Sequence, residues 1–210
     1  MASPEPELPA TAGTAEVPAE LRDYPVQLGI VRQAEYHRWL PLVKWLLAIP
    51  HFFVLVFLGI GAFVALIVAF FAVLFTGGYP RGMFDFVVGV QRWSLRVSAY
   101  VYLTVDDYPP FSLEDDPSYP VRLEIAYPEA GVDNWRPLVH WLLIIPYAIV
   151  AGALVSVAGI ITIIAFFAIL FTREYPRGMF EIVEIAFRWQ VRANAYAYFL
   201  VTRYPPFTWG

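Results

Sequence analysis

One long apolar segment occurs twice in this chain, and the second copy follows the first at a constant offset of 96 residues. Each copy opens with Trp-x-Pro, ends its apolar run in Leu-Phe-Thr, and continues through Tyr-Pro-Arg-Gly-Met-Phe to Tyr-Pro-Pro-Phe. Trp39 corresponds to Trp135, and Tyr108 corresponds to Tyr204, with no gap between these points. A fixed period of this kind indicates an internal duplication. Any fold for this chain therefore has to be built from two repeats.

The apolar runs of the two repeats, residues 42–75 and 138–171, are too long for an ordinary buried helix. About 18 consecutive apolar residues are enough to suggest a membrane span. At about 1.5 Å per residue, a straight helix of this length would be longer than the ~30 Å hydrocarbon core. The chain is 59% hydrophobic and only 15% charged, against about 25% charged residues in soluble domains. These values predict an integral membrane protein in which each run tilts, bends or turns back.

Two arrangements of each apolar run agree with the sequence. Pro50 and Pro146 occupy the same place in both runs, where proline would kink a single long span. Glycines in the middle of the runs offer instead a place to turn into a tight helical hairpin. We favour the hairpin because it leaves the flanking basic residues on the cytoplasmic side, in agreement with the positive-inside tendency. These residues are Arg38, Lys44, Arg81, Arg136, Arg173 and Arg177.

Two further elements are predicted in each repeat. Residues 26–30 and 121–125 alternate apolar side chains with smaller or polar ones, which is typical of a half-buried strand. From residue 83 to about 105, and in the matching part of the second repeat, charged residues recur at helical spacing on an apolar, aromatic-rich segment. Such a helix usually lies in the membrane interface, since a span would bury two arginines per repeat. Residues 100–103 and 196–199 have the composition of a strand but could equally end that helix.

The predicted fold is therefore mainly α and integral to the membrane, with two parallel repeats. Each repeat has a short β-strand, a long kinked or hairpin transmembrane element and an amphipathic interfacial helix. The boundaries we expect are a disordered, acidic Pro/Ala-rich tail (1–22), repeat one (23–112), an acidic linker (113–118) and repeat two (119–210). The tail lacks the apolar core of a secretory signal. We expect a multi-pass protein of the inner (plasma) membrane with a cytoplasmic N-terminal tail.

Arginine and tryptophan side chains on and just before the amphipathic segments are the candidate binding residues. Arginine offers a bidentate fork that matches a phosphate group, and tryptophan is common at headgroup depth. The alternative is that these arginines reach water or pair with acidic residues of the same helix, while the tryptophans form an ordinary aromatic belt. The candidates for contact with lipid headgroups or a protein partner are Arg81, Arg92, Arg96, Arg177, Arg188, Arg192, Trp93 and Trp189.

The sequence contains no recognisable catalytic, cofactor or metal site. It has no cysteine, so thiol catalysis and cysteine-ligated metals are excluded. Its three histidines lack metal-ligand spacing, and neither a nucleophile with a nearby base nor a phosphate-binding glycine loop is found. Acidic residues cluster at 106–107 and 114–116, where we expect a solvated loop, because the second repeat has no matching acids at the first of these clusters. The net charge of -4 argues against a nucleic-acid-binding protein, which needs a basic surface.

These elements resemble a bacterial membrane family known as domain of unknown function 4389. The resemblance rests on the Trp-led start, the apolar run that ends in Leu-Phe-Thr, the Arg-bearing amphipathic segment and the closing Tyr-Pro-Pro-Phe. It covers residues 24–209 as a tandem pair, and the second repeat departs from it at Arg173, where the first has Gly77. The resemblance implies no catalytic residue. It does imply a link between some relatives and lipid transport in the cell envelope.

We expect a non-enzymatic integral membrane protein that serves as an accessory or assembly subunit of a membrane or cell-envelope complex and contacts lipid headgroups. Its expected partners are membrane lipids and a larger membrane protein complex, with no cofactor and no nucleic acid. The alternative is a small transporter or channel with a pathway between the two repeats. That alternative needs polar residues inside the apolar runs, and few are present. They are Lys44, His51, His140, Ser156 and Thr162.

Overall fold

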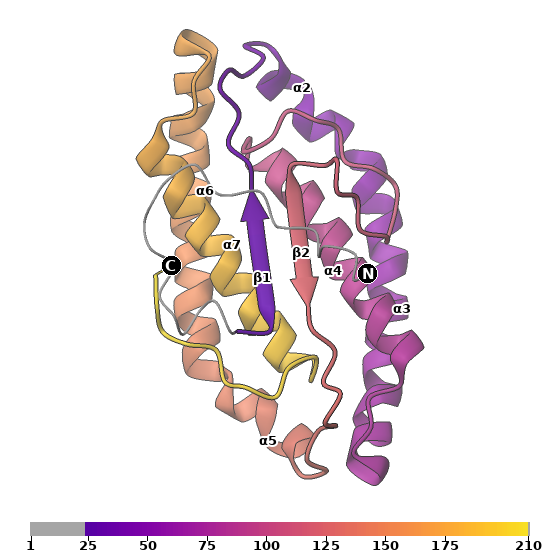
Figure 1. Ribbon diagram of the computed structural model, residues 1–210. Coiled ribbons are helices and arrows are strands. Elements are labelled where there is room, and N and C mark those ends of the chain that lie inside the picture. The colour runs from indigo at the N-terminus through magenta and orange to yellow at the C-terminus, as the bar shows by residue number, and fades with distance from the viewer. Residues whose placement is uncertain (1–23, 210) are drawn as a thin grey trace, which may run out of the picture.

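The computed structural model describes residues 24–209, so the predicted tail at residues 1–22 lies outside the described residues. Each repeat contains a short strand, a short helix and two long helices in that order (Figure 1). The first repeat has β1 (Val26–Ile30), α2 (Leu40–Leu47), α3 (Ile49–Thr76) and α4 (Arg81–Val101). The second has β2 (Val121–Ile125), α5 (Arg136–Leu143), α6 (Ile145–Thr172) and α7 (Arg177–Ala197). Both predicted strands are confirmed.

The two strands form an antiparallel ribbon in which Leu28 of β1 lies opposite Leu123 of β2. The repeats exchange these strands, because β1 packs on α7 and β2 packs on α4. Figure 1 shows the ribbon lying over these two helices, with α3 and α6 along the outer sides and running in opposite directions. The repeats are thus related by an approximate twofold rotation about the centre of the ribbon. A two-stranded ribbon is marginal by itself, and the exchange anchors each strand on a helix of the other repeat.

Each apolar run forms one long helical element with a break near its start, so the preferred hairpin is wrong. α2 and α3 are separated only at Ala48, and α5 and α6 only at Ile144. The prolines at 50 and 146 lie in the first turns of α3 and α6. Backbone N–H groups in the first turn have no partner within the helix, so a proline there costs no helical hydrogen bond. The mid-run glycines lie inside α3 and α6 without ending them. A lone glycine among good helix formers costs only about 1 kcal/mol, which is too little to force a turn.

Both long helices end at a residue with a left-handed backbone conformation. Gly77 follows α3 with a φ of 70°, and Arg173 follows α6 with a φ of 63°. Their carbonyl oxygens accept hydrogen bonds from the backbone N–H groups of Val132 (2.8 Å) and Tyr36 (2.9 Å), which lie beyond the strands of the other repeat. Each helix end is therefore tied to the segment that leaves the exchanged strand.

The amphipathic helices α4 and α7 lie between the long helices and the ribbon. α4 packs on α3 and β2, while α7 packs on α6 and β1. The segments 100–103 and 196–199, for which the sequence allows a strand or a helix end, finish these helices. Leu103 and Phe199 then turn the chain with φ values of 64° and 60°. α4 and α7 are thus the scaffold on which the strands and the long helices meet.

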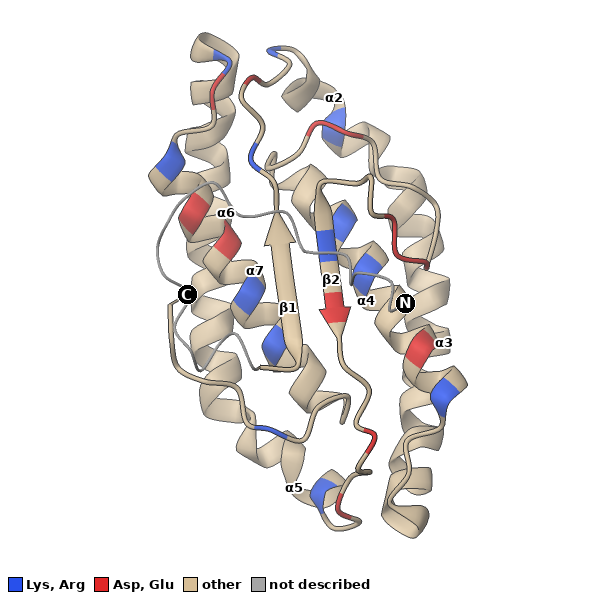
Figure 2. Cartoon of the chain, viewed as in Figure 1, with Lys and Arg blue, Asp and Glu red and all other residues tan. Residues whose placement is uncertain are grey.

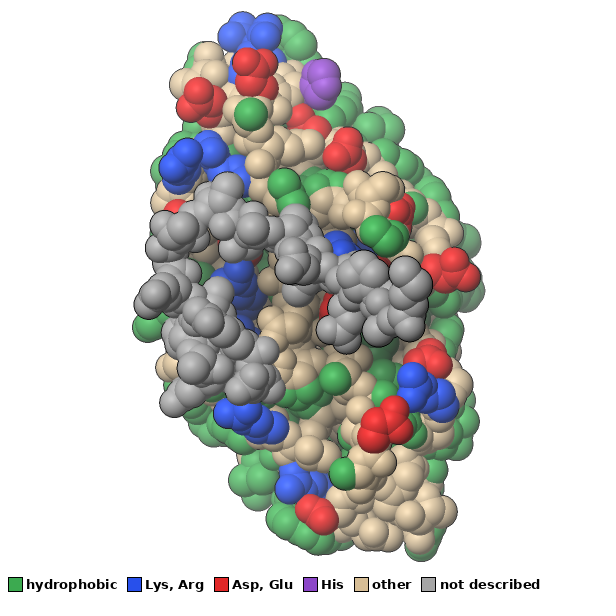
Figure 3. Space-filling view, in the orientation of Figure 1, with side chains coloured by type: hydrophobic (Ala, Val, Ile, Leu, Met, Phe, Trp, Pro, Cys, Tyr) green, Lys and Arg blue, Asp and Glu red, His purple; other side chains and the backbone are tan. Residues whose placement is uncertain are grey.

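The molecule has one face with charged residues and one apolar face. Charged residues occur along the ribbon, the linker and the starts of α4 and α7 (Figures 2 and 3), whereas α3 and α6 contain no Asp, Glu, Lys or Arg. The element α2–α3 (Leu40–Thr76) and α6 are long and apolar enough to cross a membrane, and their most apolar windows are only 11% and 17% buried. A core helix of a soluble protein would be mostly buried. The exposed side chains include Phe53, Phe57, Ile60, Phe63, Phe75, Ile149, Ile160, Ile163 and Phe171.

Candidate functional site

Arg92 and Arg96 of α4 are turned toward the ribbon and the linker. Arg92 donates from Nε to the Leu123 carbonyl oxygen (3.1 Å) and from Nη1 to that of Leu113 (3.2 Å). Arg96 is fully buried and donates from Nη2 to the Glu114 carbonyl oxygen (2.8 Å). Burial lowers the pKa of Arg96, since a buried cation loses its hydration. Both guanidinium groups hold the linker and β2 on α4, and this position fits a structural role better than contact with headgroups.

Arg188 and Arg192 take the matching positions on α7. Arg188 forms an ion pair with Glu184 at 2.7 Å, one helical turn away, which is the within-helix pairing that the sequence allows as an alternative. Arg192 is 5% exposed, and its guanidinium carbon lies 5.9 Å from the ring centroid of Tyr24. Burial lowers the pKa of Arg192 and raises the pKa of Glu184. These side chains join α7 to the segment that enters β1.

Trp93 and Trp189 are buried in aromatic clusters that the Tyr-Pro-Pro-Phe motifs close. Trp93 donates from Nε1 to Nδ1 of His51 (3.1 Å), and the His51 ring stacks on Phe111 with 4.0 Å between centroids. In the second repeat Tyr147 takes the place of His51 and stacks on Trp189 at 4.6 Å. The closing motif of each repeat therefore fixes a buried tryptophan against the start of the long helix. Five tryptophans are exposed: Trp39, Trp45, Trp135 and Trp141 lie on or beside α2 and α5, and Trp209 follows the second closing motif.

Arg81 and Arg177 differ from the other candidate arginines because their side chains are exposed. They are the first residues of α4 and α7, directly after the turns that follow α3 and α6. Arg81 forms an ion pair with Glu129 (3.1 Å), and its guanidinium carbon lies 4.4 Å from the ring centroid of Tyr127. Both positions are therefore close in sequence to the ends of the apolar helices α3 and α6.

The polar residues of the apolar runs do not converge on one pathway in the described part of the chain. Lys44 is buried and pairs with Asp106 (2.7 Å), and its counterpart His140 is buried against α7. Ser156 and Thr162 donate to carbonyl oxygens one turn earlier in their own helix. None of these side chains lines the cavity between α4 and α7.

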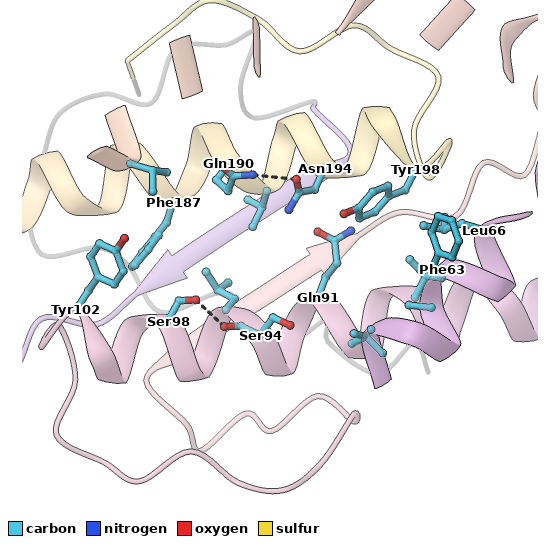
Figure 4. Close-up of a pocket in the computed structure, with 17 residues that line it drawn as sticks. Phe63, Leu66, Gln91, Ser94, Ser98, Tyr102, Phe187, Gln190, Asn194 and Tyr198 are labelled. Carbon is cyan, nitrogen blue, oxygen red and sulfur yellow. Dashed lines mark hydrogen bonds between the residues drawn. The ribbon is translucent and has the colours of Figure 1, made fainter. Parts of the chain in front are cut away.

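A cavity of about 500 Å³ lies between α4 and α7, with residues of α3 and α6 in its walls and none of the ribbon (Figure 4). Its lining combines apolar side chains with uncharged polar ones and includes no charged residue. The polar groups are Gln91, Ser94 and Ser98 from α4, Gln190 and Asn194 from α7, and the tyrosines that follow these helices, Tyr102 and Tyr198. A partly open cavity of this kind can hold an apolar molecule and fix it by a few hydrogen bonds.

Sequence reasoning missed this cavity, although a signal for it exists. Ser94 and Gln190 occupy matching positions in the two repeats, as do Ser98 and Asn194. Residues four apart lie on the same face of a helix. Ser94 and Ser98 therefore form a second polar stripe on α4, beside the arginine stripe. Gln190 and Asn194 form the matching stripe on α7. The pattern could have indicated that each of these helices has two polar faces rather than one.

The two ends of the cavity differ because Gln91 of the first repeat corresponds to Phe187 of the second. Phe187 packs edge to face on Tyr102 with 5.1 Å between centroids. At the opposite end Gln91 reaches toward Asn194 and Tyr198 (Figure 4). Gln91 is 8% exposed, and its amide nitrogen and oxygen have no hydrogen-bond partner among the described residues. One end is therefore lined by aromatic rings, and the other holds an amide without a hydrogen-bond partner among the described residues.

The family described as "Domain of unknown function (DUF4389)" matches residues 39–112 and 134–208. The chain belongs to this family. The tandem arrangement of the DUF4389 units confirms the resemblance found in the sequence. Each DUF4389 unit begins beside its short helix and ends at the Tyr-Pro-Pro-Phe motif, so both strands fall outside the matched segments. No curated protein and no solved structure matches the chain.

Proposed function

We propose that this DUF4389 protein is a non-enzymatic membrane protein that lies along one leaflet of the inner (plasma) membrane. There it serves as an accessory or assembly subunit that contacts lipid headgroups. The observation that carries the proposal is the separation of an exposed apolar face, formed by α3 and α6, from the charged residues on the ribbon side. The apolar face enters the hydrocarbon, and the charged face remains in water or against a partner complex.

The direction of the long helices supports an orientation along the membrane rather than across it. α3 and α6 run beside the ribbon on one common long axis (Figure 1). If these helices crossed the bilayer, the ribbon would cross it too. Glu124, which follows the central ribbon residue Leu123 and has a side chain that is 46% exposed, would then lie near the middle of the hydrocarbon. A charged side chain at that depth costs about 2.5–3.5 kcal/mol on insertion scales.

The exposed arginines give a second argument for this orientation. Arg81 follows α3 and Arg177 follows α6, so they lie toward opposite ends of the long axis (Figures 1 and 2). A spanning orientation would put one of them on each side of the membrane, against the positive-inside tendency. In the orientation along one leaflet, both arginines reach the same headgroup layer. The twofold axis then runs along the membrane normal, as parallel repeats require.

Phospholipid binding to Arg81 and Arg177 tests the proposal. The protein is purified in mild detergent, and bound phosphatidylglycerol or phosphatidylcholine is counted by native mass spectrometry. We expect the wild-type protein to prefer the anionic lipid. Replacing both arginines by serine should remove that preference, while replacing both by lysine should keep most of it, because each basic residue contributes about 1 kcal/mol of attraction. A monodisperse wild-type protein that retains neither phospholipid nor a protein partner would contradict the proposal.

A further inference from the structure

We propose that the cavity between α4 and α7 binds a neutral lipid with a hydroxyl-bearing head and one hydrocarbon chain, of the monoacylglycerol class. The proposed placement of α3 and α6 in the lipid layer accounts for how this ligand reaches the cavity. Binding itself depends only on the cavity and its lining. The inference rests on the size of the cavity, its uncharged lining, its position beside the apolar face and the unpaired amide of Gln91.

The size and the lining of the cavity fit a lipid-like ligand without charge. Its volume of about 500 Å³ falls within the range of about 300–1,000 Å³ that small-molecule sites occupy. Leu66 of α3, Leu95 of α4 and Val191 of α7 are among its apolar walls. A phosphate or a carboxylate would lose its hydration in this space without meeting an opposite charge. The lining therefore favours a neutral lipid over a phospholipid or a fatty acid.

The cavity lies beside the apolar face of the molecule. Phe63 lines the cavity, and 65% of its surface is exposed on α3. Gly59, one helical turn earlier, also lines the cavity and is exposed. A molecule dissolved in the hydrocarbon layer can thus reach the cavity past α3, without crossing the charged ribbon side.

Gln91 supplies the group that would hold the head of the lipid. Its side chain is more than nine-tenths buried, and both polar atoms lack a hydrogen-bond partner among the described residues. By contrast, Gln190 donates to the side-chain oxygen of Asn194 at 2.9 Å. A buried amide without partners is unfavourable, and a hydroxyl group can both donate and accept, which complements the two amide atoms. The hydrocarbon chain would then extend toward the aromatic end at Phe187.

Thermal unfolding of the full chain in detergent, with added 1-monooleoylglycerol, tests this proposal. We expect this lipid to raise the Tm of the wild-type protein and oleate at the same concentration to leave it unchanged. Gln91→Leu keeps a side chain of similar size but removes both polar atoms, and should weaken binding about tenfold. Ser156→Val is the matched control, because it removes a hydroxyl group from α6 outside the cavity, and should respond as the wild type does.

Ser98→Phe is a second variant, which fills the cavity and should abolish the Tm shift whether or not Gln91→Leu folds. Several results would overturn the proposal: no shift for the wild type, an equal shift with oleate, or an undiminished shift in Ser98→Phe or in folded Gln91→Leu. All of these measurements are made in detergent, so they do not depend on how the protein lies in a membrane. Failure of the cavity proposal therefore leaves the proposed orientation standing, and the reverse also holds.

Discussion

A buried pair in the first repeat, formed by a residue near its start and one near its end, shows how the two units have diverged on one fold. In the first repeat Lys44 pairs with Asp106, and their side chains are 1% and 7% exposed. In the second repeat the same positions hold His140 and Thr202. His140 instead contacts the carbonyl oxygen of Tyr196 through Nδ1 (3.0 Å). Both members of the pair differ together, so neither repeat is left with a buried charge that lacks a partner.

Removal of Asp106 alone should therefore be strongly destabilising. We expect Asp106→Ala to lower the free energy of unfolding by about 3–5 kcal/mol, because the Lys44 ammonium group stays buried without its partner. Lys44→His combined with Asp106→Thr copies the second repeat and should recover most of this loss. Denaturant unfolding in detergent, followed by circular dichroism, measures both effects. A double variant no more stable than Asp106→Ala would show that the two positions are not coupled in this way.

The left-handed residues at the ends of α3 and α6 give a second comparison between matched positions. A Cβ atom at Gly77 would lie 3.1 Å from Asn134 Oδ1 and 3.3 Å from the Val132 carbonyl oxygen, in addition to the cost of a positive φ of about 1–2 kcal/mol. Gly77→Ala should therefore lower the Tm. Arg173→Gly should raise it, because this position already has the same backbone conformation. Scanning fluorimetry of both variants should give shifts of opposite sign; shifts of the same sign would contradict this explanation.

Among the elements, the linker between the repeats packs directly on the backbone of α4 at Gly89, a residue without a side chain. A Cβ atom at Gly89 would lie 2.9 Å from Leu113 Cβ and 3.0 Å from the Leu113 carbonyl oxygen. Ile185 occupies the matching position of α7, so the repeated fold accommodates a large side chain there. The requirement for glycine in the first repeat therefore comes from the linker and not from the repeated fold.

Gly89→Ala should lower the free energy of unfolding by about 1–3 kcal/mol, the usual cost of overpacking a well-packed contact. The matched control is Gly82→Ala, also on α4, where a Cβ atom would meet no other atom within 4 Å. That control should be neutral or stabilising, because alanine is the better helix former. Equal destabilisation by both substitutions would show that the linker contact is not the cause.

The same elements show what the sequence can and cannot predict. The duplication, both strands and the helices after Tyr-Pro-Arg-Gly follow from local patterns, and the family match agrees with them. The hairpin was wrong because Pro50 and the mid-run glycines are both turn signals, and only packing decides between them. The strand exchange could not be predicted, since alternation along β1 does not specify its neighbour. Helical spacing placed Arg92 and Arg96 on one stripe, but it could not show that this stripe faces the ribbon.

At the scale of the whole molecule, the antiparallel course of α3 and α6 is the feature that decides how the protein can meet a membrane. The exposed apolar side chains of both helices form one face, and charged residues occur along the ribbon between the same two ends of the molecule (Figure 2). Turning the long axis across a bilayer would take these charges into the hydrocarbon. Laying it along the bilayer leaves them in water and keeps both DUF4389 units in equivalent environments.

Single-cysteine labelling in membrane vesicles tests this orientation most directly, because the chain has no cysteine of its own. Gly78→Cys after α3 and Glu174→Cys after α6 place thiols at matching positions toward opposite ends of the long axis. We expect a membrane-impermeant maleimide to label both variants from the same side. Val64→Cys, in the exposed middle of α3, should be labelled from neither side. Labelling of Gly78→Cys from one side and Glu174→Cys from the other would show instead that α3 and α6 cross the membrane, and would rule out the proposed orientation.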